Sequence, residues 1–91
     1  MAVVDITTFR LRAGVDDGTF LRTDERVRTA VLYQQPGIVR ATTARGAGGD
    51  WLILVLWASD ADADAASGAL DDVVALAEPS TVDRRRYTTF D

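Results

Sequence analysis

The chain has 91 residues, a net charge of −4 and a hydrophobic share of 47%. These values are typical of one small globular domain spanning residues 1–91, and they argue against disorder. Cysteine and histidine are absent, which excludes disulfides, thiolate chemistry and imidazole as a metal ligand or general base. The negative charge disfavours a generic phosphate-backbone binder, so no nucleic-acid partner is expected.

The N-terminus lacks the basic segment and apolar core of a secretion signal. No apolar run approaches the roughly 20 residues that cross a bilayer. The sequence therefore predicts a cytoplasmic protein that has no membrane partner.

Residues 2–13 alternate in the manner of a strand, with Asp5, Thr7 and Phe9 on one face. Gly14 closes this strand. Asp16 and Asp17 then offer an N-cap, and helical spacing of apolar residues predicts a helix as far as Gln35. Pro36-Gly37 ends this helix.

A second strand is expected over residues 38–45, joined by the turn Gly46–Gly49 to a third strand over residues 51–59. A glycine-rich loop that binds phosphate needs a helix after it, and here a strand follows, so phosphate binding is disfavoured. The third strand is apolar on both faces, which requires protein on both sides. Its two rows are Trp51, Ile53, Val55 and Trp57, and Leu52, Leu54, Leu56 and Ala58.

A second helix is expected over residues 59–77, with Gly68 as a point of close packing or of a break. The spacing of Asp60, Asp62 and Asp64 invites a calcium loop, but the required glycine and the final glutamate of such a loop are missing. An acidic helix start, favoured by the helix dipole, is the preferred interpretation, and no metal is expected. A last strand is expected over residues 82–90.

The order β-α-β-β-α-β predicts a ferredoxin-like α+β fold, in which an antiparallel sheet carries two helices on one face. Its first and third strands are then central. The other face of the sheet needs a cover, and so short a chain cannot supply it. A homodimer with its two sheets face to face, a dimeric α+β barrel, is the expected solution.

Three segments of the chain resemble the antibiotic biosynthesis monooxygenase-like (ABM) domains of the dimeric α+β barrel superfamily. They are Phe9–Gly14, Gln35-Pro36-Gly37, and Leu56–Ser59 with the acidic helix start that follows. The resemblance implies that fold and a site between helices and sheet, lined at the Trp57 position. It implies either a cofactor-free monooxygenase acting on phenolic substrates or a relative that degrades haem. Thr7 stands where haem degraders carry Asn, and histidine is missing, so haem degradation is disfavoured.

We therefore expect a monooxygenase-like protein for a small hydrophobic, aromatic molecule, with no cofactor. The contrasting hypothesis is a non-catalytic ligand-binding or dimerisation module. Trp57 is the first candidate catalytic residue, because its indole stacks on flat rings or donates its N–H, although a core tryptophan is the commoner role. Asp5 is a candidate base for a phenolic proton, or else an exposed strand end. Phe9 is expected to hold the ring with Trp57.

The other candidate polar groups of the pocket are Tyr33, Arg40 and Tyr87, with Thr7 beside Asp5. Tyr33 is an alternative proton carrier, and an arginine stabilises a phenolate or enolate. Each has surface or interface contact as its alternative role. Trp51 is a further candidate for binding the substrate, with a rim or dimer contact as its commoner role. The run Arg84–Arg86 alternates faces and is flanked by Asp83, so it is predicted to form ion pairs or to guard a sheet edge. An RNA-recognition domain is disfavoured because its aromatic and glycine pattern is missing.

Overall fold

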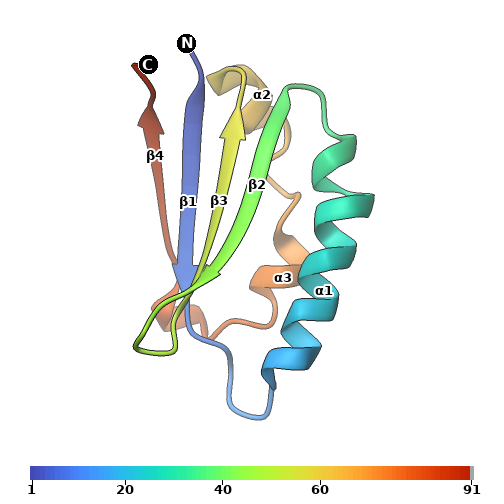
Figure 1. Ribbon diagram of the computed structural model, residues 1–91, viewed down its shortest axis with the longest axis vertical. Helices are drawn as coiled ribbons and strands as arrows, with labels where there is room; N and C mark the ends of the chain where they lie inside the picture. The colour runs from blue at the N-terminus through green and yellow to red at the C-terminus, as the bar shows by residue number, and fades with distance from the viewer. Residues whose placement is uncertain (91) are drawn as a thin grey trace.

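The computed structural model describes residues 1–90. Four strands form a single antiparallel sheet in the order β2-β3-β1-β4 (Figure 1). The predicted ferredoxin-like α+β fold is confirmed, with β1 and β3 at the centre of the sheet. The elements in chain order are β1 Val3–Phe9, α1 Asp17–Ala30, the 3₁₀ turn η1 Leu32–Gln34, β2 Ile38–Arg45, β3 Trp51–Trp57, α2 Asp60–Ala65, α3 Asp71–Val74, the 3₁₀ turn η2 Pro79–Thr81 and β4 Asp83–Thr88.

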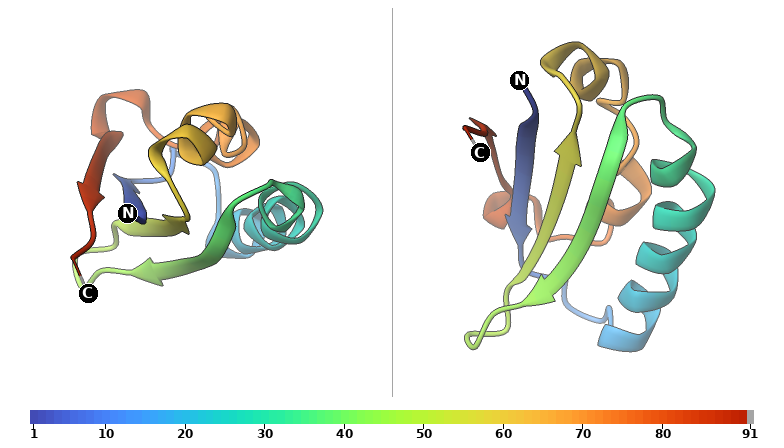
Figure 2. Two further views of the ribbon diagram at one scale, coloured as in Figure 1. Left: turned by 90° about the horizontal axis from the view of Figure 1, so that it is seen from above. Right: turned by 45° about the horizontal axis from the view of Figure 1, so that its top comes forward.

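The three helices lie on one side of the sheet, and the other side carries no helix (Figure 2). The row of β3 that starts at Trp51 faces the helices and is buried. It packs with side chains of β1, α1 and α3 into one core. The buried apolar residues are Val3, Phe9, Phe20, Val27, Leu32, Trp51, Ile53, Val55, Trp57, Ala63, Val73 and Ala77.

The opposite side of the sheet, the uncovered face, has the second row of β3 at its centre. Leu54 and Leu56 are only half-buried there. Their register partners on β1, Ile6 and Val4, are half-buried as well. Directly paired residues of antiparallel strands share a face, so this apolar surface runs across both central strands. Its apolar members are Val4, Ile6, Leu52, Leu54 and Leu56.

The first helix starts where the sequence predicts and ends earlier. The carboxylate of Asp16 accepts the N–H of Thr19 at 2.7 Å, and this hydrogen bond lowers the pKa of Asp16 below its ordinary value. Helix α1 ends at Ala30, and the chain continues as η1. The expectation that one helix reaches Gln35 is therefore wrong in its last turn. A tightened 3₁₀ turn is a common way to satisfy the last carbonyls of a helix.

The expected helix over residues 59–77 is two short helices with a turn between them. Ser59 caps α2, where its Oγ accepts the N–H of Asp62 at 3.2 Å. Helix α2 ends at Ala65, and hydrogen bonds spanning three residues replace the helical pattern up to α3. Gly68 sits in the middle of this stretch, where glycine weakens a helix by about 1 kcal/mol relative to alanine. The segment 66–70 is the connecting turn between α2 and α3.

The first and last strands of the chain are shorter than expected. Strand β1 ends at Phe9, and beyond it Leu11 makes only an isolated bridge with Ala77. Strand β4 covers Asp83–Thr88 rather than residues 82–90. Among residues 1–90, no helix is both long and apolar enough to span a membrane.

Candidate functional site

A cavity of about 310 Å³ lies between the helix side of the sheet and the segment from α2 to Leu70. Ligand pockets for small molecules start at about this size. Strands β1, β3 and β4 form its floor, and α2 with the connecting turn forms its roof. The lining residues are Asp5, Ile6, Thr7, Leu32, Val55, Trp57, Ala63, Ala66, Ser67, Ala69, Leu70, Arg84, Arg85 and Arg86.

Trp57 and Thr7 supply the floor of the cavity from the two central strands. Both side chains are nearly covered, at 3% and 4% exposure. Among residues 1–90, every buried side-chain nitrogen or oxygen of this protein has a hydrogen-bond partner. The Trp57 indole N–H and the Thr7 hydroxyl have no partner among the hydrogen bonds of residues 1–90, so each of these polar atoms keeps some exposed surface.

The roof is built from small apolar side chains. Ala63 is buried, and Ala66 and Ala69 of the connecting turn are half-buried. A continuous helix would have carried these residues at other angles, so the break around Gly68 shapes the cavity. An indole below and alanines above form an apolar slot, which suits a flat ring.

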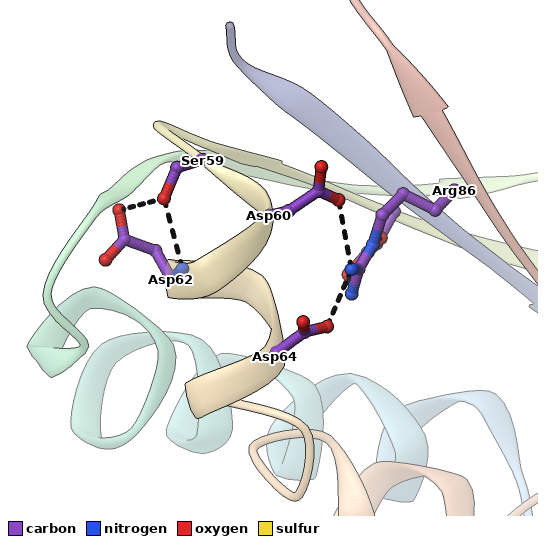
Figure 3. A network of polar contacts seen from close by, with 6 residues as sticks. Ser59, Asp60, Asp62, Asp64 and Arg86 are labelled. Atoms are coloured by element: carbon purple, nitrogen blue, oxygen red, sulfur yellow. Dashed lines mark hydrogen bonds and ion pairs between the residues drawn. The ribbon is translucent and has the colours of Figure 1, made fainter.

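Arg86 closes one wall of the cavity by joining the sheet to α2 (Figure 3). Its Nε donates to Asp5 Oδ1 at 2.6 Å, and its Nη2 donates to Asp5 Oδ2 at 3.3 Å. Its Nη1 donates to Asp64 at 2.7 Å and to Asp60 at 3.2 Å. Three carboxylates thus share one guanidinium, and the bidentate contact fixes the orientation of Asp5.

These contacts stabilise the charged form of Arg86. The hydrogen bond with Asp5, followed by the one with Asp64, raises the pKa of Arg86 further above its ordinary value. The guanidinium therefore stays protonated at any physiological pH. Asp5 is thereby a paired carboxylate at the cavity wall, neither the exposed strand end nor the isolated buried base that the sequence left open.

The three acidic residues of α2 do not form a metal site. Asp60 and Asp64 point to Arg86, whereas Asp62 accepts the hydroxyl of Ser59 at 2.9 Å on the other side of the helix (Figure 3). In the described part of the chain, no group of three or more potential metal-binding side chains comes together.

Phe9 and Trp51 share the helix side of the sheet with Trp57, but they lie at the far end of it. The rings of Phe9 and Phe20 meet edge to face at 5.6 Å, and Phe20 lies 4.6 Å from Trp51. The guanidinium of Arg45 lies 5.5 Å from the Trp51 ring centroid. Both predicted ring-binding residues are therefore part of the core, and Trp51 does not occupy the expected rim.

Arg40 and Tyr87 lie on the uncovered face, away from the cavity. Arg40 pairs with Leu56, and Tyr87 pairs with Val4. Both side chains are exposed. The structure thus brings together Asp5, Thr7 and Trp57 and separates these two residues from them.

Tyr33 lies outside the cavity, at the free edge of β2. Its hydroxyl accepts the N–H of Ala41 at 3.0 Å and approaches the Ala41 carbonyl oxygen at 3.4 Å. These groups face outward from the edge strand, where unpaired backbone groups invite pairing with another chain. Tyr33 therefore caps a sheet edge.

A Tyr33→Phe variant tests this placement. We expect a loss of about 1 kcal/mol in the free energy of unfolding, because the two exposed hydrogen bonds of the hydroxyl to the backbone of Ala41 are removed. Ligand binding in the cavity should not change. Chemical denaturation measures the change in stability, and a binding titration measures the affinity for a ligand in the cavity. If Tyr33 acted in the cavity, the variant would instead keep its stability and bind the ligand more weakly.

Arg84, Arg86 and the alanines of the roof were not among the predicted site residues. The arginine run was visible in the sequence, and its predicted ion pairs are confirmed for Arg85, which contacts Asp83 at 2.9 Å, and for Arg86. Which of the three faces the cavity depends on the register of β4. No local pattern of the sequence reports that register.

Comparisons with known proteins identify the fold. No family model and no curated protein matches the chain. Among solved structures, it is similar to a mutant form of SnoaB from Streptomyces nogalater, described as a cofactor-independent oxygenase. The TM-score is 0.80 at 20% identity, covering 99% of this chain and 94% of that one.

Two further structures show the same likeness. Rv0793 from Mycobacterium tuberculosis matches with a TM-score of 0.78 at 15% identity, covering 100% of this chain and 97% of that one. A candidate antibiotic biosynthesis monooxygenase from Nitrosomonas europaea matches with 0.78 at 14% identity, covering 98% and 99%. The chain therefore has the ABM-like fold that its sequence segments indicated.

Proposed function

We propose that this chain is an ABM-like monooxygenase, which binds a small aromatic molecule in the Trp57 cavity and oxidises it with molecular oxygen, without a cofactor. The observation that carries the proposal is the apolar slot between Trp57 and the alanines of the roof, with a carboxylate at its wall. The same fold in SnoaB, described as a cofactor-independent oxygenase, supports it.

The chemistry requires only a base and a cavity that excludes bulk water. Asp5 accepts a proton from the activated CH₂ group of a phenolic, anthrone-type substrate. The resulting carbanion reduces oxygen and forms a C–O bond to a hydroperoxide, which loses water to give the quinone. One O₂ converts the CH₂ group into C=O plus one H₂O, so atoms and electrons balance. Arg86 holds the Asp5 carboxylate in place for this step through two hydrogen bonds.

An Asp5→Asn variant tests the base. We expect quinone formation from an anthrone- or naphthol-type substrate in air to fall about 100-fold or more, as is typical for loss of a general base. Asp64→Asn is the matched control, because it also removes a partner of Arg86 and leaves the carboxylate of β1 in place. Equal activity of both variants and the parent chain would remove Asp5 from the mechanism.

A second candidate function is a ligand-binding module without catalysis. The observation in its favour is that Arg86 already donates hydrogen bonds to both oxygens of Asp5, which leaves the carboxylate less free to contact a substrate proton. In a Trp51→Phe background, Trp57 is the one remaining tryptophan, so its fluorescence reports binding. Saturable quenching with no quinone across the substrate panel would establish the binding module in place of the oxygenase.

We also propose that a second copy of this chain covers the uncovered face and completes a dimeric α+β barrel. The half-buried leucines of β3 and their apolar neighbours on β1 support this proposal, because extended apolar surface on a small protein marks an interaction site. A cytoplasmic location stays a prediction, which fractionation of the native cells checks.

A further inference from the structure

Three consecutive arginines line the cavity, and two of them are already neutralised. Arg86 is held by Asp5, Asp60 and Asp64. Arg85 pairs with Asp83 at 2.9 Å. It stands opposite Ile6 in the register of β4 and β1, which places it on the uncovered side of the sheet.

Arg84 differs from both neighbours. It makes no ion pair or side-chain hydrogen bond within the part of the chain that the structure describes. Its register partner on β1 is Thr7, so Arg84 and Thr7 share the helix side of the sheet and the cavity wall. A guanidinium and a hydroxyl together form a donor pair that matches an oxyanion.

In the described stretch of the chain, Arg84 is a positive charge without a compensating carboxylate, in a protein that is negative overall. The whole chain carries a net charge of −4, so its average field repels anions. The carboxylate of β1 on the same face as Thr7, Asp5, is compensated by Arg86. Arg84 is therefore, among residues 1–90, the uncompensated positive charge at a wall that is otherwise apolar or paired.

We infer that the cavity selects aromatic molecules that carry a carboxylate, with the carboxylate on Arg84 and Thr7 and the ring on Trp57. This inference rests on the proposed binding of an aromatic molecule in the same cavity and names its chemical class. Arginine forms two parallel hydrogen bonds with a carboxylate, which an uncharged amide of the same shape cannot match.

Calorimetric titration with 1-hydroxy-2-naphthoate and with the corresponding amide tests the inference. The parent chain should bind the carboxylate at least tenfold more tightly than the amide. Raising the salt concentration should weaken the binding of the carboxylate compound and leave the binding of the amide unchanged, since salt screens an exposed ion pair. Equal affinities for the two compounds would overturn the inference.

Arg84→Gln should abolish the preference and leave the affinity for the amide within about twofold. Arg84→Lys should restore part of the preference, because it keeps the charge and loses the bidentate geometry. Arg12→Gln is the matched control and should behave like the parent chain, because Arg12 is exposed and does not line the cavity. A preference that persists in Arg84→Gln, with folding verified by thermal unfolding, would also overturn the inference.

The proposed function and this inference fail in different ways. Amide binding and quinone formation without a preference for the carboxylate would remove the role of Arg84 and leave the oxygenase proposal standing. Absence of binding by both compounds, with no quinone from any substrate, would remove both.

Discussion

A Leu54→Asp variant is expected to sediment as a monomer at micromolar concentrations, at which the parent chain is expected to sediment as the proposed dimer. Leu54 lies on β3 at the centre of the uncovered face, between Ile6 of β1 and Thr42 of β2. A carboxylate buried there without a partner costs several kcal/mol. A two-fold interface contains the substitution twice, so the dissociation constant should rise by about 1,000-fold or more.

Leu21→Asp provides the matched control for this experiment. Leu21 is 46% exposed on α1, on the side of the sheet that already has its cover. The same change of side chain there should leave the dimer intact. Circular dichroism should show a folded chain in both variants, because neither side chain belongs to the core. A parent chain that remains a single protomer would refute the barrel itself.

The fold was predictable because its signals are local and repeated. Alternation along β1 and β3 identifies them as strands. The two apolar rows of β3 identify it as a central strand whose two faces are both covered by protein. Pro36-Gly37 and the Gly46–Gly49 turn mark the ends of elements in a way that tertiary contacts rarely override. The break in the second helix was harder to foresee, since one glycine lowers helix stability by only about 1 kcal/mol.

The sequence predicted on which face of a strand each site residue lies, but not how far along the strand it lies from the cavity. Alternation placed Asp5 and Thr7 on one face of the first strand, and the resemblance placed Trp57 at a site between helices and sheet. All three residues line the cavity. Alternation does not report the position of a residue along the strand. Phe9 was therefore predicted to line the pocket, although it belongs to the core at the end of β1 that lies away from the cavity.

Residues on the edge strands depend on register and on bulges. Arg40 follows a register shift near Ile38 and ends on the uncovered face. Arg84 and Arg86 reach the cavity because β4 pairs with β1 in one particular register. Sequence patterns contain the charges of such residues but not their partners, which come from elements up to 81 positions away.

The second large effect is expected from Gly37→Ala, which should lower the free energy of unfolding by about 3 kcal/mol. Gly37 has a φ of +81°, a conformation that other residues adopt at a cost. A Cβ at this position would overlap the side chain of Asp62. Asp62 cannot easily move away, because the hydroxyl of Ser59 donates to its carboxylate at 2.9 Å.

Strand β3 holds the same turn from the other side. The N–H of Ala58 donates to the carbonyl of Gly37 at 2.8 Å. A methyl group on Gly37 therefore has to displace the first turn of α2, which carries Asp60 and its contact with Arg86. Since α2 forms the roof of the cavity, the variant should also bind aromatic ligands more weakly.

Two further variants separate backbone strain from overlap. Gly14 has a φ of +88°, and a Cβ added there would meet nothing within 4 Å, so Gly14→Ala should cost only about 1 kcal/mol. Adding Asp62→Gly to Gly37→Ala should recover most of the remaining loss, measured relative to Asp62→Gly alone, because every overlapping side-chain atom of Asp62, the Cβ included, is gone. Chemical denaturation of the set measures these differences. Equal losses in Gly14→Ala and Gly37→Ala would show that the contact with Asp62 does not hold the turn against α2.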